Sequence, residues 1–356
     1  MERALTEFRT ALRSREETAV EKMRADWQAA RTGIFKRLEA LLKKMQEAEE
    51  NGQPITPSWL LSQARYRELL DQIDSEVLTL VQAQTQPLAD AQRDMAQTAV
   101  EAAPALTRAA LGTPPPGAHI EWNRLPAASV EAIAGFASDG SPLSDLLHEF
   151  GQTVSVGLRG ALLEGAAAGL SYTQIATNVQ AIVGTEKGGI TESRAVNLVR
   201  TELHRAARAA SSEAYARNIN LMAGWVWVSA RDTRSCSCCW AMHGTFHNLA
   251  ERLDGHCQCR CCMAPRTKSW AEILGDDSLP DTRPVIESGE ALFAKLTEDE
   301  QKSILGLEKH RLYSEGKITL TDTVTQTHDA RWGSMRVVAN LAQCLESAEA
   351  RTTQTP

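Results

Sequence analysis

The first fifty residues carry apolar side chains at every third or fourth position. Leu5, Phe8 and Leu12 begin this series and Leu38 continues it, with acidic and basic residues in near balance between them. Apolar positions at this spacing lie on one face of an α-helix. The pattern therefore predicts a single long amphipathic helix over residues 2 to about 50.

A second long helix is predicted to end near residue 110. Gly52 stops the first helix, and Thr56 is a helix cap followed by a proline at the first helical position. Pro87 and Pro104 are expected to kink or break this second helix, because proline lacks the backbone N–H. The two helices predict a long hairpin. Such a narrow hairpin buries little by itself, so it serves either as part of a helical bundle or as an arm that packs on a partner protein.

The segment "LGTPPPGAH" at residues 111–119 is the best candidate for a linker. Three further helices are predicted beyond it, the first ending at Gly169 and the second capped by Ser171. The pattern then changes at "GWVWVSA", which predicts a strand with Trp225 and Trp227 on one face.

The last ninety residues are acidic and predict short helices. Residues 270–316 hold 11 acidic against five basic residues, and the short helices are expected to end at Gly316. The final stretch, residues 346–356, is expected to be disordered.

These patterns predict a mainly α fold. A long N-terminal helical hairpin precedes a helical α+β domain that contains a small Cys-rich, zinc-knuckle-like subdomain. The expected boundaries are residues 1–112 for the arm, 113–139 for a linker, 140–268 for the domain with the knuckle, 269–340 for an acidic helical extension and 341–356 for a tail.

Charge and hydropathy exclude some classes of protein. The net charge is −7, so the whole chain is not a basic nucleic-acid coat. The N-terminus has no apolar run like that of a signal peptide, and no stretch approaches the length of a membrane helix. We therefore expect a reducing compartment and no membrane partner. In such a compartment, clustered cysteines are more often metal ligands than disulfides.

Seven of the eight cysteines lie in "CSCCWAMHGTFHNLAERLDGHCQCRCC", residues 236–262, which we call the knuckle. Cys236 and Cys239 form a Cys-x-x-Cys pair. After a linker of 16 residues, His256 and Cys259 repeat the two-residue gap, and Cys261 follows. Two such turns at this distance are typical of a structural zinc site.

The preferred ligand set is Cys236, Cys239, Cys259 and either His256 or Cys261. Disulfides, or thiols without a ligand, remain as alternatives. The cysteines adjacent to these ligands are expected to face away; they are Cys238, Cys257 and Cys262. Cys344, far away in the sequence, is expected to be a buried small apolar residue.

The predicted zinc is structural and closed, and we predict no catalytic residue and no enzyme. The chain lacks His-Glu-x-x-His and the zinc deaminase signature. His243 and His247 have helical spacing but no glutamate between them. They are expected to be loop or turn residues.

Four segments, read together, resemble a known family. They are "VRTELHRA", "DTRSCSCCWAMHG" after a Trp-ended strand, "HCQCRCCMAP" and "ILGLEKHRLYSEGKITLTD". Their order and spacing are similar to those of phage head morphogenesis proteins of the phage Mu protein F-like family, over roughly residues 140 to 330. The matching positions are Arg200, Thr201, Glu202, Trp225 or Trp227, Asp232, Cys236, Cys239, Gly244, His256, Cys259, Arg260, Cys261 and Pro265. Cys257 stands where the family often has a proline.

The resemblance implies a minor head protein of a phage or prophage virion. Such a protein is present in few copies near the portal vertex and acts in capsid assembly, DNA packaging or ejection. The implied partners are portal and capsid proteins and the packaged double-stranded DNA, and assembly takes place in the host cytoplasm. The helical arm is compatible with docking on a ring of subunits.

Two interpretations of the Arg200-Thr201-Glu202 motif remain open, as do two alternative functions, DNA binding and DNA cleavage. Arg200 and Glu202 serve either solvent and local ion pairs or pin the knuckle to their helix, for example through Asp232 and Arg260. A DNA-binding zinc module is suggested by six basic against three acidic residues over 231–268. Trp240 and Phe246 are its candidate stacking residues. "FHNL" and "LDGH" suggest a metal-dependent nuclease, but in an order that does not fit the usual His-Asn-His arrangement.

Overall fold

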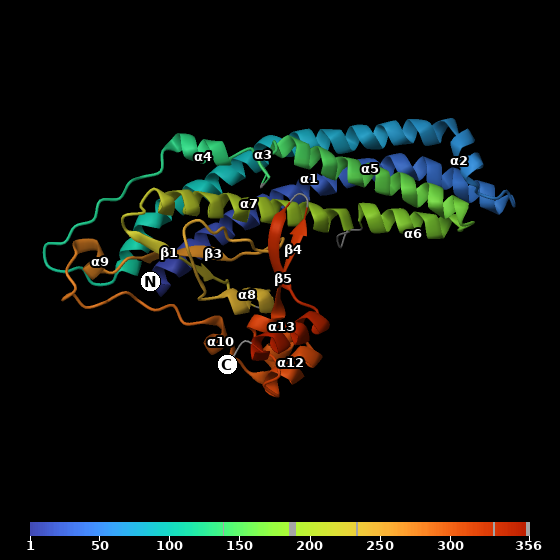
Figure 1. Cartoon of the computed structure of the whole chain (residues 1–356). Helices are drawn as coiled ribbons and strands as arrows, with labels where there is room; N and C mark the ends of the chain where they lie inside the picture. The colour runs from blue at the N-terminus through green and yellow to red at the C-terminus, as the bar shows by residue number, and fades with distance from the viewer. Residues whose placement is uncertain (138, 185–189, 233, 330–331, 354–356) are drawn as a thin grey trace. The chain divides into compact units, whose positions relative to one another are not determined.

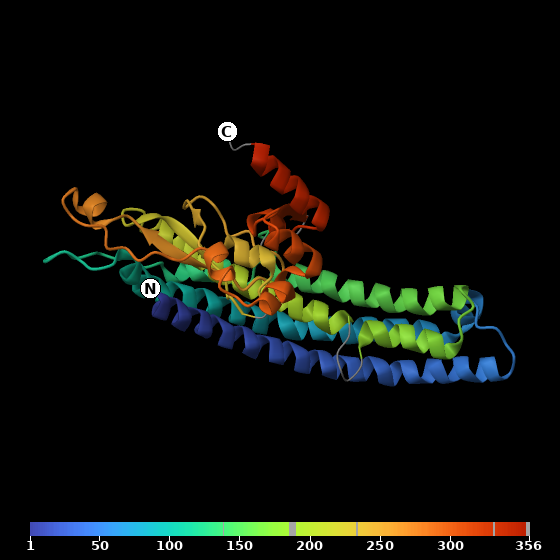
Figure 2. The ribbon, with the colours of Figure 1, turned by 90° about the horizontal axis from the view of Figure 1, so that it is seen from below.

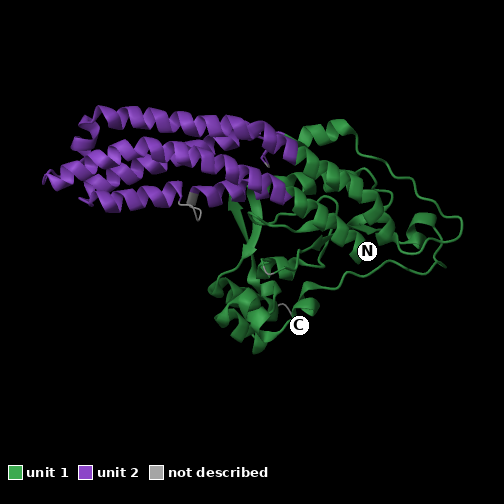
Figure 3. Cartoon of the chain, turned by 180° about the vertical axis from the view of Figure 1, so that it is seen from behind, with its two compact units in different colours: residues 1–15, 92–134, 201–356 green, residues 16–91, 135–200 purple. Residues whose placement is uncertain are grey.

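The structure is a computed structural model that describes residues 1–353 except 138, 185–189, 233 and 330–331. The chain forms two compact units (Figure 3). Unit 1 comprises residues 1–15, 92–134 and 201–356, and unit 2 comprises residues 16–91 and 135–200. In the part of the chain that is described, none of the helices combines the length and the apolarity needed to cross a membrane.

Three long helices contribute residues to both units. They are α1 (Glu2–Glu50), α3 (Ala64–Leu111) and α7 (Ile190–Ala216). Unit 2 adds α2 (Pro57–Ser62), α5 (Leu143–Ala167) and α6 (Tyr172–Val183), and its long helices run alongside one another (Figures 1 and 2). The mainly α fold with a long N-terminal helical region is confirmed.

Local sequence explains where the helices of unit 2 begin. Thr56 caps α2 by accepting a hydrogen bond from the Trp59 N–H, as predicted. Ser171 caps α6 in a full capping box with Gln174, and Gly169 ends the preceding helical segment with a positive φ of 67°. These caps satisfy N–H groups that have no partner inside the helix.

The core of unit 2 is built from the apolar stripes of its helices. Its buried side chains come from α1, α2, α3, α5 and α6, among them Trp27, Ile34, Leu38, Leu69, Leu158 and Val179. At its margin Arg37 of α1 pairs with Glu76 of α3. Burying an apolar side chain of this size contributes about 2 kcal/mol, so the stripes hold the bundle together.

The expected break at the prolines of the second helix was wrong. The helix α3 continues through both Pro87 and Pro104. An interior proline costs about 3 kcal/mol. However, Leu88, Ala103 and Leu106 beside the two prolines are all buried. The stripe stays in phase across both positions, so its packing outweighs the two missing hydrogen bonds.

Unit 1 contains a three-stranded antiparallel sheet with the order β2-β1-β3. Its strands are β1 (Met222–Val228), β2 (Phe246–His247) and β3 (Cys262–Thr267). The strand predicted at residues 224–230 is therefore present, two residues earlier, whereas β3 was not predicted. Trp225 and Trp227 are buried in one apolar cluster with Ala214 and Tyr215 of α7, so the sheet packs on that helix.

The remaining elements of unit 1 are short. They are α4 (Ala127–Ile133), α8 (Ser237–Met242), α9 (Trp270–Leu274), α10 (Gly289–Phe293), α11 (Glu298–Leu305), α12 (Leu307–Ser314), the 3₁₀ turn η1 (Thr321–Thr323), the hairpin of β4 (Val324–Asp329) and β5 (Gly333–Val338), and α13 (Leu341–Thr353). The short acidic helices ending before Gly316, with its positive φ of 70°, agree with the sequence pattern.

The expected disorder of the tail was wrong for the residues that are described. Residues 346–353 continue α13, and residues 354–356 lie outside the described part. The buried carboxylate of Asp322 accepts hydrogen bonds from Ser347 and Arg351 of this helix. Cys344 is fully buried, as predicted, so both polar and apolar contacts hold α13 in place.

Leu158→Ala should destabilise unit 2, because Leu158 is fully buried in its core. Removing a buried leucine side chain costs about 2 to 5 kcal/mol. Thermal melting followed by circular dichroism should show a clearly lower midpoint. The matched control is Val156→Ala on the same helix, where the side chain is 67% exposed and the midpoint should hardly change. Equal melting of both variants would contradict this core.

Candidate metal centre

The first half of the knuckle is a turn that leads from β1 into α8. Asp232 Oδ1 accepts hydrogen bonds from the Arg234 N–H and the Ser235 hydroxyl, which closes the turn. Burial opposes ionisation of Asp232, but these hydrogen bonds and the charge of Arg234 outweigh it and lower its pKa. Cys236 then occupies the N-cap position of α8 without a side-chain capping hydrogen bond, and Cys239 lies one turn along the helix. Both thiols therefore face the same side.

The second half of the knuckle is an irregular loop held against α7. Gln258 has a positive φ of 63°, unusual for a side chain of this kind, and its N–H donates to Thr201 Oγ1 at 3.0 Å. Gly255 has no room for a side chain, because an added Cβ would lie 2.7 Å from Cys259 Sγ. The loop is thus fixed at the point where it brings His256 and Cys259 towards α8.

Five donors meet where the two halves converge. The structure forms two groups of three, Cys236–Cys239–His256 and Cys239–Cys259–Cys261, and within each group the ligand atoms lie within 4.8 Å of one another. Cys236 Sγ and Cys239 Sγ lie 3.2 Å and 3.3 Å from His256 Nε2. Cys239 Sγ lies 3.8 Å from Cys259 Sγ.

The sulfur–nitrogen separations of 3.2 Å and 3.3 Å and the sulfur–sulfur separation of 3.8 Å are close to those of a tetrahedral zinc site, although Cys259 falls in the group with Cys239 and Cys261 and not in the group with Cys236 and His256. Zinc bonds of about 2.3 Å to sulfur and about 2.0 Å to nitrogen place the ligand atoms roughly 3.5 to 3.8 Å apart. The donor set is soft, and Cys239, Cys259 and Cys261 are buried. A soft and largely buried set of donors of this kind could bind a metal ion.

The ring of His256 has the orientation that a metal ligand needs. Its Nδ1 lies 2.6 Å from the carbonyl oxygen of Cys257, which favours the tautomer with the proton on Nδ1. The lone pair of Nε2 then points to the thiols of Cys236 and Cys239. Ligating histidines commonly donate their second N–H to a carbonyl in this way.

The donors also influence one another's protonation. Burial disfavours charged His256, but its hydrogen bond with Cys236 and the nearby thiolates outweigh burial and raise its pKa to about 9. Hydrogen bonds from neighbouring thiols lower the pKa of Cys236 and Cys259. Hydrogen bonds to those thiolates raise the pKa of Cys239. The cluster therefore holds thiolates ready for a cation.

The other cysteines of the knuckle have different surroundings. The thiol of Cys238 is buried, and the neighbouring Cys236 together with burial raises its pKa. Cys257 Sγ lies 4.0 Å from Met335 Sδ on β5. Cys262 is buried at the start of β3, where burial raises its pKa to about 11. Among the residues described, none of these three belongs to a group of ligand atoms that could hold a metal.

The structure brings only part of the predicted motif to the knuckle. Thr201 binds the loop, whereas Arg200 Nε donates to the buried carboxylate of Glu16 at 2.8 Å within unit 2. Glu202 is buried and Arg260 is half-buried. The ion pair of Arg200 therefore joins α7 to α1 within unit 2.

Gly244 and Pro265 support the sheet rather than the ligands. Gly244 has a positive φ of 84°, and an added Cβ would lie 3.0 Å from the carbonyl oxygen of Glu287. Pro265 lies on β3 opposite Trp225. These two motif positions therefore fix the backbone that carries the knuckle.

Sequence reasoning missed Arg208. Its Nε donates to the carbonyl oxygen of Cys261 at 3.0 Å and its Nη2 to that of Cys259 at 2.5 Å. Arg208 lies seven residues after Thr201, two turns along the same face of α7. That spacing was the available signal, but it did not show which side of the helix faces the knuckle.

The two histidines inside the knuckle are not ligands of this cluster. His243 is the C-cap of α8, in the turn that was expected. His247 lies on β2, stacked on Trp225 with ring centroids 4.2 Å apart, and its Nδ1 lies 2.8 Å from Glu251. Its ring therefore has a structural role in packing the sheet.

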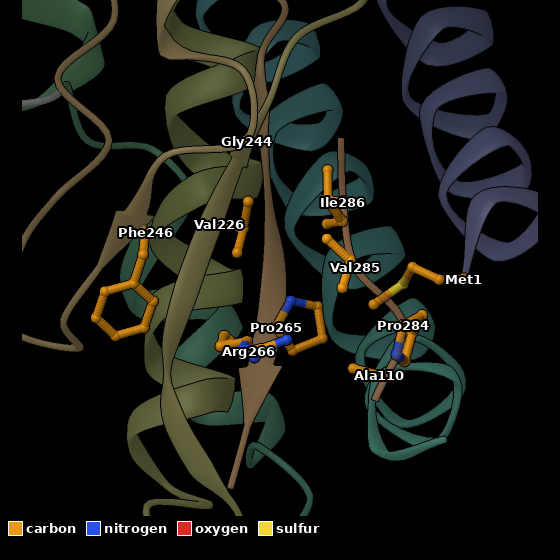
Figure 4. Close-up of a pocket in the computed structure, with 10 residues that line it drawn as sticks. All are labelled: Met1, Ala110, Val226, Gly244, Phe246, Pro265, Arg266, Pro284, Val285 and Ile286. Carbon is orange, nitrogen blue, oxygen red and sulfur yellow. The ribbon is translucent and has the colours of Figure 1, made fainter. Parts of the chain in front are cut away.

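An apolar pocket of about 300 Å³ lies beside the sheet (Figure 4). It is lined by Met1, Ala110, Val226, Gly244, Phe246, Pro265, Arg266, Pro284, Val285 and Ile286. Arg266 is the one charged side chain among these residues. The pocket thus has no paired acid and base and no nucleophile, and the metal cluster is the stronger candidate site.

Comparison with known proteins finds one family. Residues 157–264 match the family model described as "Phage Mu protein F like protein". The match runs from within α5 to β3 and includes all five donors of the cluster. No curated protein and no solved structure matches the chain.

His243 should make the protein sensitive to acid. Its Nδ1 accepts a hydrogen bond from the Ser229 N–H at 3.0 Å. Burial, together with the charges of Arg231 and Arg9, outweighs the opposing effect of Glu2 and lowers its pKa to about 4. The unfolded chain binds the proton near pH 6.5, so this stabilisation is complete above pH 6.5 and is lost as the pH falls towards 4.

Between pH 6.5 and 5 the wild type should therefore lose about 1.5 kcal/mol more unfolding free energy than His243→Gln. Denaturant titration at both pH values measures this difference. Any acid-driven metal loss lowers both proteins alike. The exposed His119→Gln is the control and should follow the wild type. Parallel pH profiles for the wild type and His243→Gln would refute the prediction.

Proposed function

We propose that the chain is a minor head protein of a phage or prophage, because residues 157–264 match the phage Mu protein F-like family, a phage head morphogenesis family. It acts in capsid assembly, DNA packaging or ejection near the portal. A metal knuckle stabilises the domain that this family shares. The family match is the observation that carries the proposal, because every predicted donor lies inside it.

The proposed metal is zinc, held by Cys236, Cys239, His256 and Cys259. His256 touches the first two thiols, and Cys259 lies 3.8 Å from Cys239. The ion supplies the bonds that hold the two halves of the knuckle together. Its role is structural, because four protein donors leave no open position for a substrate.

The proposed partners are portal and capsid proteins. The long helices α1 and α3 provide extended surface for docking on a ring of subunits, and residues 1–112 form the proposed docking arm. The remaining proposed divisions are a linker at residues 113–139, the family domain at 140–268, the acidic extension at 269–340 and the tail at 341–356. In the infected cell the chain would pass from the host cytoplasm into the virion.

Direct binding to the packaged DNA gains less support. Arg231 is paired with Glu2 and Arg234 with Asp232, which offsets part of the positive charge of the knuckle. The suggested stacking role of Trp240 was wrong, because its ring is buried edge-on against Phe293. Nor does His247 suit a nuclease, since its ring is stacked inside the sheet rather than presented to solvent.

Protein purified under reducing conditions should contain about one zinc per chain. Cys236→Ala should lose the metal and melt at a lower temperature, because metal binding contributes to folding. Elemental analysis and thermal melting measure both effects. The matched control is Cys344→Ala, a buried cysteine outside the cluster that should keep its zinc. Wild-type protein without metal, whose thiols prove to be paired, would establish the disulfide alternative instead.

Heads assembled from the portal and capsid proteins of the same phage should incorporate this chain in few copies. Quantitative mass spectrometry of purified heads measures the incorporation. Cys236→Ala should reduce it, whereas Cys344→Ala should not, because only the first loses the knuckle. Heads that form normally but contain none of the wild-type chain would overturn the proposed function.

A further inference from the structure

Arg208 is a buried cation at the base of the knuckle. Its side chain extends from α7 and only 7% of the residue is exposed. Its guanidinium donates to the carbonyl oxygens of Cys259 and Cys261. An added Cβ at Gly255 would lie 3.3 Å from its Nη1, so the guanidinium fills the space under the loop.

The charge of Arg208 needs a counter-charge. Burying an unpaired cation costs several kcal/mol, and carbonyl oxygens satisfy its donors without neutralising it. Among the residues that the structure describes, the contacts of Arg208 include no ion pair with a carboxylate. The anionic groups next to it are the thiolates of the knuckle, beginning with Cys259, whose backbone it binds.

We propose that Arg208 is a positioning residue of the metal centre, whose positive charge balances a zinc ion held by three thiolates and one imidazole. This rests on the zinc site of the proposed function. Three thiolates and one Zn²⁺ carry a net charge of minus one, and the guanidinium brings the buried group to neutrality. Its two hydrogen bonds also fix the backbone on both sides of Arg260.

The charge balance selects among the five donors. A site of four thiolates, with Cys261 in place of His256, would carry a net charge of minus two and leave one charge uncompensated by Arg208. A site with His256 is neutral as a whole, and His256 already faces Cys236 and Cys239. Cys261 then stays a thiol beside the site, outside the ligand set.

The test is the zinc affinity of Arg208→Gln and Arg208→Lys, measured by competition with a chromophoric chelator. Supporting residues around a metal typically change its affinity by about 10- to 100-fold. We expect that loss for Arg208→Gln, and a loss of only a few-fold for Arg208→Lys, which keeps the charge. The control is Arg205→Gln on the same helix, whose guanidinium donates to the carbonyl of Trp332 and lies over its ring.

Unchanged affinity in Arg208→Gln, or equal losses in the Gln and Lys variants, would overturn the role of the charge. Cobalt substitution adds a readout of the ligand set. Cys261→Ser should keep the affinity within a few-fold and leave the thiolate-to-cobalt absorption unchanged. Loss of about one-quarter of that absorption or more, the result expected when one of four thiolate ligands is removed, would overturn the selection of His256. This variant decides the ligand set even if Arg208→Gln does not fold.

Failure here and failure of the proposed function have separate signatures. Wild-type protein that binds no zinc refutes the metal centre itself. Wild-type protein that binds zinc, with Arg208→Gln equally tight, refutes only the inference about Arg208. Incorporation into heads is measured independently of both.

Discussion

The convergence of thiols and one imidazole is the constraint on which the rest of unit 1 depends. Cys236, Cys239, His256 and Cys259 come from two turns that have no regular secondary structure in common. Thiolates at about 4 Å repel one another, so such a cluster requires protons or a cation to be stable. Protons can supply this balance, since the pKa of His256 is raised and that of Cys236 is lowered. The proposed zinc ion would replace them with metal–ligand bonds.

The helix α7 supports the second turn of the knuckle. It contributes Thr201 and Arg208 to the loop, and Tyr215, whose hydroxyl donates to the carbonyl of Met263 on β3. The same helix packs against Trp225 and Trp227 through its apolar side chains. One helix therefore contacts both the sheet and the second turn of the knuckle, and the segment that matches the family model includes this helix as well as the cysteines.

The knuckle in turn organises the C-terminal part of the chain. Arg336 on β5 donates to Asp254, and its backbone N–H donates to the Asp254 carbonyl, just before the second pair of donors. Trp240 of α8 packs on Phe293 of α10. A small cysteine-rich motif with little core of its own thereby becomes part of a larger packed unit.

The sequence by itself determined the features that depend on neighbouring residues. The long first helix, the caps at Thr56 and Ser171 and the strand with paired tryptophans all follow from local spacing and backbone chemistry. The two cysteine turns also follow from spacing, and the structure brings their donors together.

Only the tertiary structure decided the features that depend on distant contacts. Packing in phase carries α3 through Pro87 and Pro104, and Asp322 holds α13 where the local composition indicates disorder. Pairing with β1 makes a strand of residues 262–267, although the local pattern there is dominated by cysteine spacing. Arg208 contacts the knuckle only because the fold brings α7 against a loop more than fifty residues away in the sequence. Local propensity contains no information on such contacts, because their energy exists only once the chain has folded.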